Sequence, residues 1–176
     1  MPSLTPTVRP AEAGDARNVA QIQVTTWREA YAHILSANEL EALDVDKSAD
    51  FWRGQISSSP STGAQLLVAE LNDGIVGFSS FGPARDDDLK GGSIMELYAL
   101  YVYPTLWAAG VGQALMSATQ RRWAEQRINE ATLWVFEQNG RARRFYEKSG
   151  WRLDPRVCPI GENPAELEVR YRLNQE

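Results

Sequence analysis

The segment ELYALYVYPTLWAAGVGQAL, residues 96–115, decides the fold of this chain because three kinds of structure follow one another in it. The apolar residues Glu96–Val102 predict a strand, and Pro104–Ala109 predicts a turn. A helix is predicted from Val111 onward, with Leu115, Ala118 and Trp123 recurring on one side. The segment therefore predicts a strand that enters a helix through a turn of small residues.

The two glycines at this helix start, Gly110 and Gly112, indicate a site for a phosphate. The first N–H groups of a helix have no partner within it, and the helix dipole favours an anion there. Glycine has no side chain to keep a phosphate away from these N–H groups. The segment is neither a Walker loop nor a Rossmann fingerprint. Two glycines at this spacing also occur in ordinary tight turns, so a second motif is needed.

That second motif is NGRARRFYEKSGW, Asn139–Trp151, which follows the strand-like run Thr132–Phe136. Asn139 is a residue type that caps helices, and Gly150 can adopt the left-handed conformation that ends them. Three residues between these ends fall at helical spacing: Ala142, Phe145 and Tyr146. The chain thus contains two strand-to-helix units in tandem.

With both motifs in place, the chain resembles the GNAT superfamily of N-acetyltransferases over nearly its whole length. The family's acetyl-CoA motif, Arg/Gln-x-x-Gly-x-Gly/Ala, is similar to residues 107–112, although Trp107 departs from the first position. The N-terminal piece VRPAEAGDARNVAQIQVTTWREAYAHIL resembles the opening of one GNAT branch. The family's Asn-x-x-Ala-x-x-Phe-Tyr-x-x-x-Gly-Phe/Trp helix is matched by Asn139, Ala142, Phe145, Tyr146, Gly150 and Trp151.

The resemblance implies one α/β domain over residues 1–176, with its core at about 7–173 and a mixed, mostly antiparallel sheet flanked by helices. Its two central strands should separate near Leu100–Val102 and admit the cofactor between them. Other local patterns agree, since Asn72-Asp73-Gly74 predicts a hairpin turn and Ser36 begins a capping-box sequence. The serine-rich residues 57–63 and the segment around Cys158 are predicted to be loops.

The resemblance also implies that acetyl-CoA is the cosubstrate and indicates which residues hold it. The main chain of Leu100, Tyr101 and Val102 should pair with the pantetheine amides. The side chain of Asn139 should hydrogen-bond the pantetheine arm, with capping of its own helix as the alternative. Backbone N–H groups of the turn should hold the pyrophosphate: Trp107, Ala108, Ala109, Gly110, Val111, Gly112 and Gln113.

Acetyl transfer to an amine needs a base, since an alkylamine with a pKa of about 10.4 is mostly protonated at pH 7. Glu96 is the candidate base, acting directly or through a water, because it is a carboxylate in an otherwise apolar strand. Its alternatives are a solvent-exposed strand start or a pair with an arginine. Tyr146 matches the family's tyrosine and is the candidate acid for the departing thiolate, whereas ordinary core packing is its alternative.

The acceptor is predicted to be a primary amine of a small molecule that attacks bound acetyl-CoA directly in a ternary complex. Trp27, Tyr31 and Tyr98 are the candidates for an aromatic acceptor pocket, unless they belong to the core. The alternatives are a protein or peptide N-acetyltransferase, acting on an α-amine or lysine, and a non-catalytic acyl-CoA-binding module. Asp86-Asp87-Asp88 lies in a loop that could overhang the acceptor, although such a run is usually a solvated turn.

Composition argues against nucleic-acid binding, an ordinary metal site and a membrane span. The formal charge of −5 disfavours a nucleic-acid partner. One cysteine and one histidine do not provide an ordinary metal site or a disulfide. No apolar run approaches the roughly 20 residues that span a bilayer, and the start lacks signal-peptide features. We therefore expect a cytoplasmic protein with no membrane or nucleic-acid partner, and the resemblance suggests a homodimer.

Overall fold

The computed structural model describes residues 5–72, 74–160 and 163–175, and contains a seven-stranded sheet in the order β1-β2-β3-β4-β5-β7-β6. Neighbouring strands are antiparallel except β4 and β5, which pair in parallel. The predicted mixed, mostly antiparallel sheet is confirmed. The strands are β1 (Thr7–Pro10), β2 (Gln65–Leu71), β3 (Gly74–Pro83), β4 (Ile94–Val102), β5 (Glu130–Phe136), β6 (Arg152–Ile160) and β7 (Asn163–Asn174).

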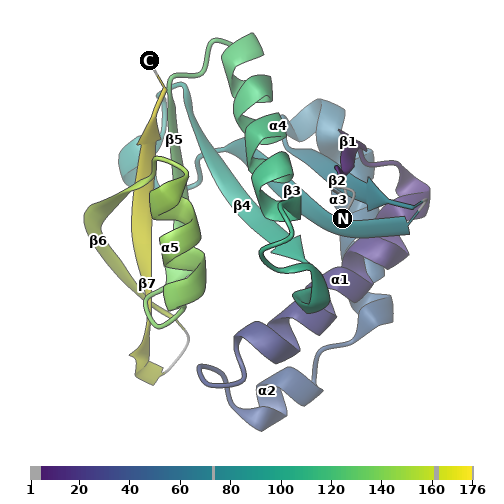
Figure 1. Ribbon diagram of the computed structural model, residues 1–176. Coiled ribbons are helices and arrows are strands. Elements are labelled where there is room, and N and C mark those ends of the chain that lie inside the picture. Colours follow the sequence, from purple (N-terminus) through teal and green to yellow (C-terminus); the bar gives the residue numbers. More distant parts are fainter. Residues whose placement is uncertain (1–4, 73, 161–162, 176) are drawn as a thin grey trace.

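Helices cover both faces of this sheet (Figure 1). Helices α4 (Val111–Glu125) and α5 (Gly140–Lys148) lie on one face, and α1 (Ala16–Ala30) and α3 (Val45–Thr62) lie on the other. The short α2 (Ala37–Glu41) follows the end of α1. Three single 3-10 turns complete the described elements: η1 (Ala13–Asp15), η2 (Asp87–Leu89) and η3 (Pro104–Leu106). In the described ranges, no helix is both long and apolar enough to cross a bilayer.

Helix α1 forms where the apolar residues recur at helical spacing. Val19, Ile22 and Thr26 are buried, as the pattern predicts. The hydroxyl of Thr26 donates to the carbonyl of Val102 at 3.2 Å, which ties α1 to the end of β4. This hydrogen bond fixes one end of α1 beside the part of the sheet where the candidate site lies.

The prediction of a loop at residues 57–63 is wrong, because α3 continues through the serines to Thr62. Asp44 caps the helix start by accepting from two backbone N–H groups, and Trp52 is buried with its indole N–H on Gln23. The serine-rich end is held by its own hydroxyls: Ser58 donates to the carbonyl of Gln55 at 3.2 Å, and Ser61 and Thr62 donate to that of Ser58 at 2.9 and 3.2 Å. Gly63 then ends it with a φ of 73°.

The prediction of a loop around Cys158 is also wrong, because β6 runs through it and pairs with β7. Cys158 lies opposite Glu168 in this register. The strand contains Pro155 and Pro159, and it is the outermost strand of the sheet. An edge strand tolerates proline because its outward N–H groups need no partner strand.

The central strands β4 and β5 pair only over Ile94–Leu97 and Glu130–Leu133. Both strands continue beyond this ladder, to Val102 and Phe136, and Figure 1 shows them diverging toward the end of the sheet near α2. A register shift in the β3–β4 ladder leaves Tyr98 as an extra residue between Leu97 and Ala99. The predicted separation is therefore present, and it begins just after Leu97.

Candidate active site

The turn before α4 presents backbone N–H groups rather than side chains. Gly110 is the N-cap residue with a φ of 88°, and Ala108 has a φ of 65°. No side chain caps this helix, so the N–H groups of Val111, Gly112 and Gln113 have no intrahelical or capping partner. The left-handed conformation at Gly110 explains why glycine is needed there.

Two of the seven turn residues predicted to hold the pyrophosphate already use their N–H groups inside the turn. Trp107 donates to the carbonyl of Pro104 and Ala109 donates to the carbonyl of Leu106, both at 3.2 Å. A Cβ on Gly112 would lie 3.5 Å from the ring of Phe145, which is an ordinary van der Waals contact, so packing against α5 does not itself require glycine here. The predicted anion site therefore narrows to the other five N–H groups, those of Ala108, Gly110, Val111, Gly112 and Gln113.

After Leu97, β4 no longer pairs with β5, so one edge of its main chain is open. Tyr103 donates its N–H to Val76 of β3, and strand geometry points the backbone groups of alternate residues the same way. Tyr101 therefore directs its backbone toward β3, whereas Leu100 and Val102 direct theirs toward the open edge. Of the three predicted pantetheine contacts, only Leu100 and Val102 lie in position to pair with a ligand.

One acceptor at this edge is already occupied. The carbonyl of Val102 accepts from the hydroxyl of Thr26 and from the indole N–H of Trp107, the latter at 2.9 Å. A carbonyl oxygen has two lone pairs, so these two donors saturate it. The N–H of Val102 and both backbone groups of Leu100 remain for a ligand.

A cationic side chain that the sequence analysis did not predict stacks on Trp107. The guanidinium of Arg141, in the first turn of α5, lies over the indole ring. Burial lowers the pKa of Arg141, although a guanidinium remains charged at neutral pH. The positive charge missing at position 107 is thus supplied by another helix. No sequence spacing could have connected residues 107 and 141.

Asn139 caps its own helix, which was the alternative role in the sequence analysis. Its side-chain oxygen accepts from the N–H of Ala142 at 3.2 Å and so caps α5, and the residue is buried. Because the cap uses the oxygen, the side-chain nitrogen is still available to donate. The structure therefore shows the capping role and leaves the contact with pantetheine as a prediction.

Glu96 is 2% exposed and is held by Arg85, as one alternative in the sequence analysis anticipated. The guanidinium contacts one carboxylate oxygen at 2.6 Å and the other at 3.2 Å. The backbone N–H of Arg85 donates to the second oxygen at 3.0 Å. Hydrogen bonding to Glu96 raises the pKa of Arg85. The candidate base is therefore engaged in three hydrogen bonds.

Tyr146 projects from α5 into the body of the protein and is 9% exposed. Its ring contacts those of Phe145 and Trp151, with centroids 5.5 and 6.2 Å away. Within the described residues, no hydrogen-bond partner is found for its hydroxyl. Burial, followed by repulsion from Tyr101, raises the pKa of Tyr146. The phenol thus keeps its proton at neutral pH, so its hydroxyl can act as a hydrogen-bond donor.

The three predicted acceptor-pocket residues lie in two groups. Trp27 and Tyr31 contact each other at 5.2 Å between centroids, and Tyr31 lies 4.8 Å from Phe136 of β5. Tyr98 is apart from them, with its hydroxyl on the carbonyl of Pro83. The guanidinium of Arg85 lies 4.3 Å from the centroid of the Tyr98 ring. Tyr98 thus adjoins the candidate base rather than the aromatic group.

Glu168 is a carboxylate near the site that sequence reasoning missed. It lies on β7 opposite Phe136 and is half-buried. Burial raises its pKa, while Arg85 lowers it and Glu96 raises it. The apolar/polar alternation of β7 predicts an outward, solvated side chain here, so no local signal distinguishes it.

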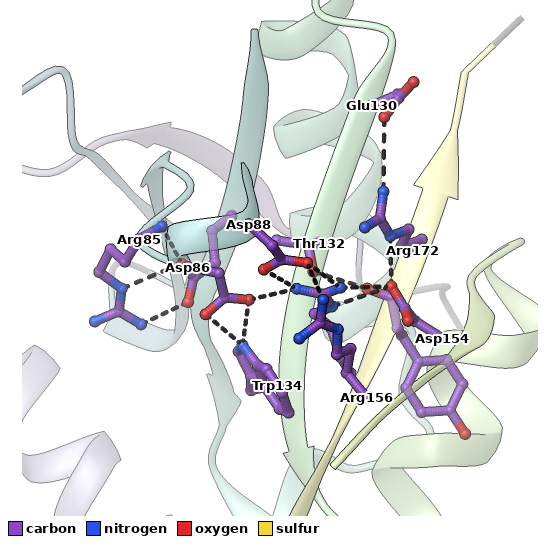
Figure 2. A network of polar contacts seen from close by, with 12 residues as sticks. Arg85, Asp86, Asp88, Glu130, Thr132, Trp134, Asp154, Arg156 and Arg172 are labelled. Carbon is purple, nitrogen blue, oxygen red and sulfur yellow. Dashed lines mark hydrogen bonds and ion pairs between the residues drawn. The ribbon is translucent and has the colours of Figure 1, made fainter. Parts of the chain in front are cut away.

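Two of the three acidic residues at Asp86–Asp88 are engaged in the fold, whereas Asp87 is exposed and pairs with Lys90. Asp86 and Asp88 both pair with Arg170 of β7, which is buried, and Asp86 also accepts from the indole N–H of Trp134. Figure 2 shows the dashed contacts of Asp86 and Asp88, which continue toward Asp154. We call the contacts of Arg170 with Asp86, Asp88 and Asp154 the Arg170 network.

Comparison with known proteins gives a family match over most of the chain. The model described as "Acetyltransferase (GNAT) family" matches residues 22–151. YuaI of Bacillus subtilis, an uncharacterized N-acetyltransferase, is 29% identical over 76% of this chain and 73% of its own length. The probable N-acetyltransferase Rv2775 of Mycobacterium tuberculosis is 28% identical over 85% of this chain and 82% of its own.

Solved structures share the fold. The PaiA N-acetyltransferase of Thermoplasma acidophilum, in complex with coenzyme A, has a TM-score of 0.79 and 19% identity, covering 97% of this chain and 99% of that one. YncA of Salmonella typhimurium, with its cofactor acetyl-CoA, has a TM-score of 0.72 and 19% identity, covering 98% and 95%. The predicted fold and family resemblance are confirmed.

Proposed function

This chain belongs to the acetyltransferase (GNAT) family, and from that premise we propose that it transfers the acetyl group of acetyl-CoA to a primary amine of a small molecule. The single observation that carries the proposal is the open backbone at the end of β4 next to the uncapped start of α4. Such a pair of surfaces fits an elongated ligand with amides at one end and phosphates at the other.

In this proposal the N–H groups from Gly110 to Gln113 hold the diphosphate, because a helix start favours an anion. The guanidinium of Arg141 lies beside this turn and supplies a further positive charge. Leu100 and the N–H of Val102 pair with the amides of the pantetheine arm, and the side-chain nitrogen of Asn139 supports the same arm. Acetyl-CoA itself supplies the thioester that the amine attacks.

The chain's own residues would then move two protons. Glu96 accepts one proton from the acceptor ammonium, directly or through a water, and passes it to solvent. The freed nitrogen forms the bond to the acetyl carbon while the carbon–sulfur bond breaks and its electron pair goes to sulfur. Tyr146 protonates the sulfur and regains a proton from the nitrogen. No covalent acyl-enzyme is needed.

Calorimetric titration with CoA, followed by a thiol-release assay on a panel of amines and peptides, tests the proposal. We expect CoA to bind and small primary amines to release thiol from acetyl-CoA. Binding without thiol release from any acceptor would favour the non-catalytic module. Faster release with peptides than with small amines would favour a protein acceptor. Absence of CoA binding would contradict the proposal altogether.

A further inference from the structure

The two partners of the Arg85–Glu96 ion pair differ in solvent exposure. The side chain of Glu96 is 2% exposed, whereas that of Arg85 is 66% exposed. The guanidinium therefore contacts the carboxylate from the solvent side, and it can move without disrupting packed side chains. Any acceptor that reaches Glu96 must displace this guanidinium.

A simple cationic amine is a poor match for this arrangement. It would approach a carboxylate whose oxygens already accept from Arg85 at 2.6 and 3.2 Å, and the two cations would repel each other. After displacement, the guanidinium would lose its carboxylate partner next to a second positive charge. Water can solvate the displaced guanidinium, which is 66% exposed, but the repulsion between the two cations remains.

An acceptor that carries a negative as well as a positive charge avoids this repulsion between cations. We propose that the acceptor carries a carboxylate beside its amine, as an α-amino acid does, and that it exchanges partners with the Arg85–Glu96 pair. Its ammonium contacts Glu96 while its carboxylate takes the guanidinium of Arg85. Arginine suits this role because its planar fork binds a carboxylate through two hydrogen bonds. This inference rests on the proposed function and names the substrate class for the same site.

The surroundings of Arg85 would let it change partners without leaving the site. The ring of Tyr98 lies 4.3 Å from the guanidinium and can hold the cation during the exchange. The backbone N–H of Arg85 also donates to Glu96, and this bond does not depend on the position of the side chain. Glu96 thus stays oriented while the guanidinium moves.

The backbone at Arg85 is itself anchored by the next residue. Asp86 pairs with the buried Arg170 at 2.8 Å and accepts from Trp134 at 3.0 Å. Figure 2 shows Asp86 next to Arg85, with the dashed contacts of Asp86 directed away from Arg85. A fixed backbone next to an exposed, movable side chain is the arrangement that an exchange of ion pairs requires.

The test compares, in the wild-type protein, each common α-amino acid with its methyl ester and its decarboxylated amine in the thiol-release assay. For at least one side chain we expect kcat/KM of the free acid to exceed that of both analogues by about 100-fold, as expected for a charged hydrogen-bonded pair. Equal or faster turnover of the esters, the plain amines or peptides would overturn the inference and leave the proposed function intact. No thiol release from any acceptor, with CoA bound, would overturn both.

Variants then assign the preference to Arg85. Arg85→Gln should raise KM for the free acid far more than for the decarboxylated amine, and Arg85→Lys should give an intermediate result. The matched control is Arg156→Gln, which removes an exposed arginine that contacts Asp88 at 3.2 Å, and it should leave the preference unchanged. If Arg85→Gln reduces turnover of acids, esters and amines equally, Arg85 has only a structural role.

Discussion

Two polar regions of this molecule differ in how completely their groups are paired. In the Arg170 network the buried guanidinium meets three carboxylates, which come from the β3–β4 connection and from β6. At the open end of β4 and the start of α4, backbone N–H groups face outward with no strand or side-chain cap against them. The first region fastens a loop to the sheet, whereas the second has the unpaired N–H groups that the proposed CoA site requires. We therefore assign a structural role to the first region and propose a ligand-binding role for the second.

The largest expected effect is a loss of stability when the Arg170 network is disrupted. Arg170→Met should lower the free energy of unfolding by about 3–5 kcal/mol, because it leaves carboxylates without their buried cation. Chemical denaturation measures this loss. Arg156→Met is the control, since its side chain is 59% exposed and an exposed ion pair is worth about 0–1 kcal/mol. Equal losses for the two variants would contradict the distinction.

A large effect on turnover is expected from Tyr146→Phe, which removes a hydroxyl that lacks a hydrogen-bond partner among the described residues. Thiol release should fall by a factor on the order of 10 to 1,000, while CoA affinity and the denaturation midpoint stay close to wild type. Tyr103→Phe, at the end of β4, is the matched control and should keep full turnover. Unchanged turnover in Tyr146→Phe would remove this residue from the role of acid.

A smaller effect is expected at the helix start. Gln113 is exposed on the first turn of α4, and Gln113→Glu places a negative charge beside the N–H groups that should hold the diphosphate. CoA affinity should fall about tenfold at low salt, whereas the stability of α4 should not decrease because a carboxylate favours a helix start. Gln120→Glu makes the same change farther along the helix and should bind CoA normally. Equal affinities for both variants, measured by calorimetry, would argue against the anion site.

The smallest effect concerns acid stability. Hydrogen bonding to Arg170 lowers the pKa of Asp88; for Asp154, burial opposes the hydrogen bonds from Arg172 and Arg170, which still lower its pKa. The stability from such carboxylates is present above the unfolded pKa and is lost as the pH falls through the folded one. Thermal midpoints should therefore drop below about pH 4, and less steeply in Arg170→Met. Identical slopes in both proteins would show that other groups control acid unfolding.

The sequence predicted what depends on local patterns. Helical spacing located the buried residues of α1, and asparagine and glycine marked the ends of α5 where the structure has them. The strand, the turn and the helix start around Gly110 were also predicted. Each of these features depends on residues close together in the chain.

Features set by tertiary packing were not predictable. The partner of Glu96 could be named only as an arginine, because Arg85 reaches it through the β3–β4 connection rather than by any period. Arg141 meets Trp107 from another helix, and Glu168 looks like one of several solvated residues on β7. The serine-rich end of α3 is helical against the expectation from its composition, and its hydroxyls donate to backbone carbonyls of the same helix.

A crystal structure with CoA bound tests the central claim most directly. We expect the diphosphate within hydrogen-bonding distance of the N–H groups from Gly110 to Gln113, and the pantetheine amides paired with the backbone of Leu100. The sulfur should lie near the hydroxyl of Tyr146. A diphosphate bound elsewhere, or an indole of Trp107 that still occupies the edge of β4 and excludes the pantetheine, would contradict the account.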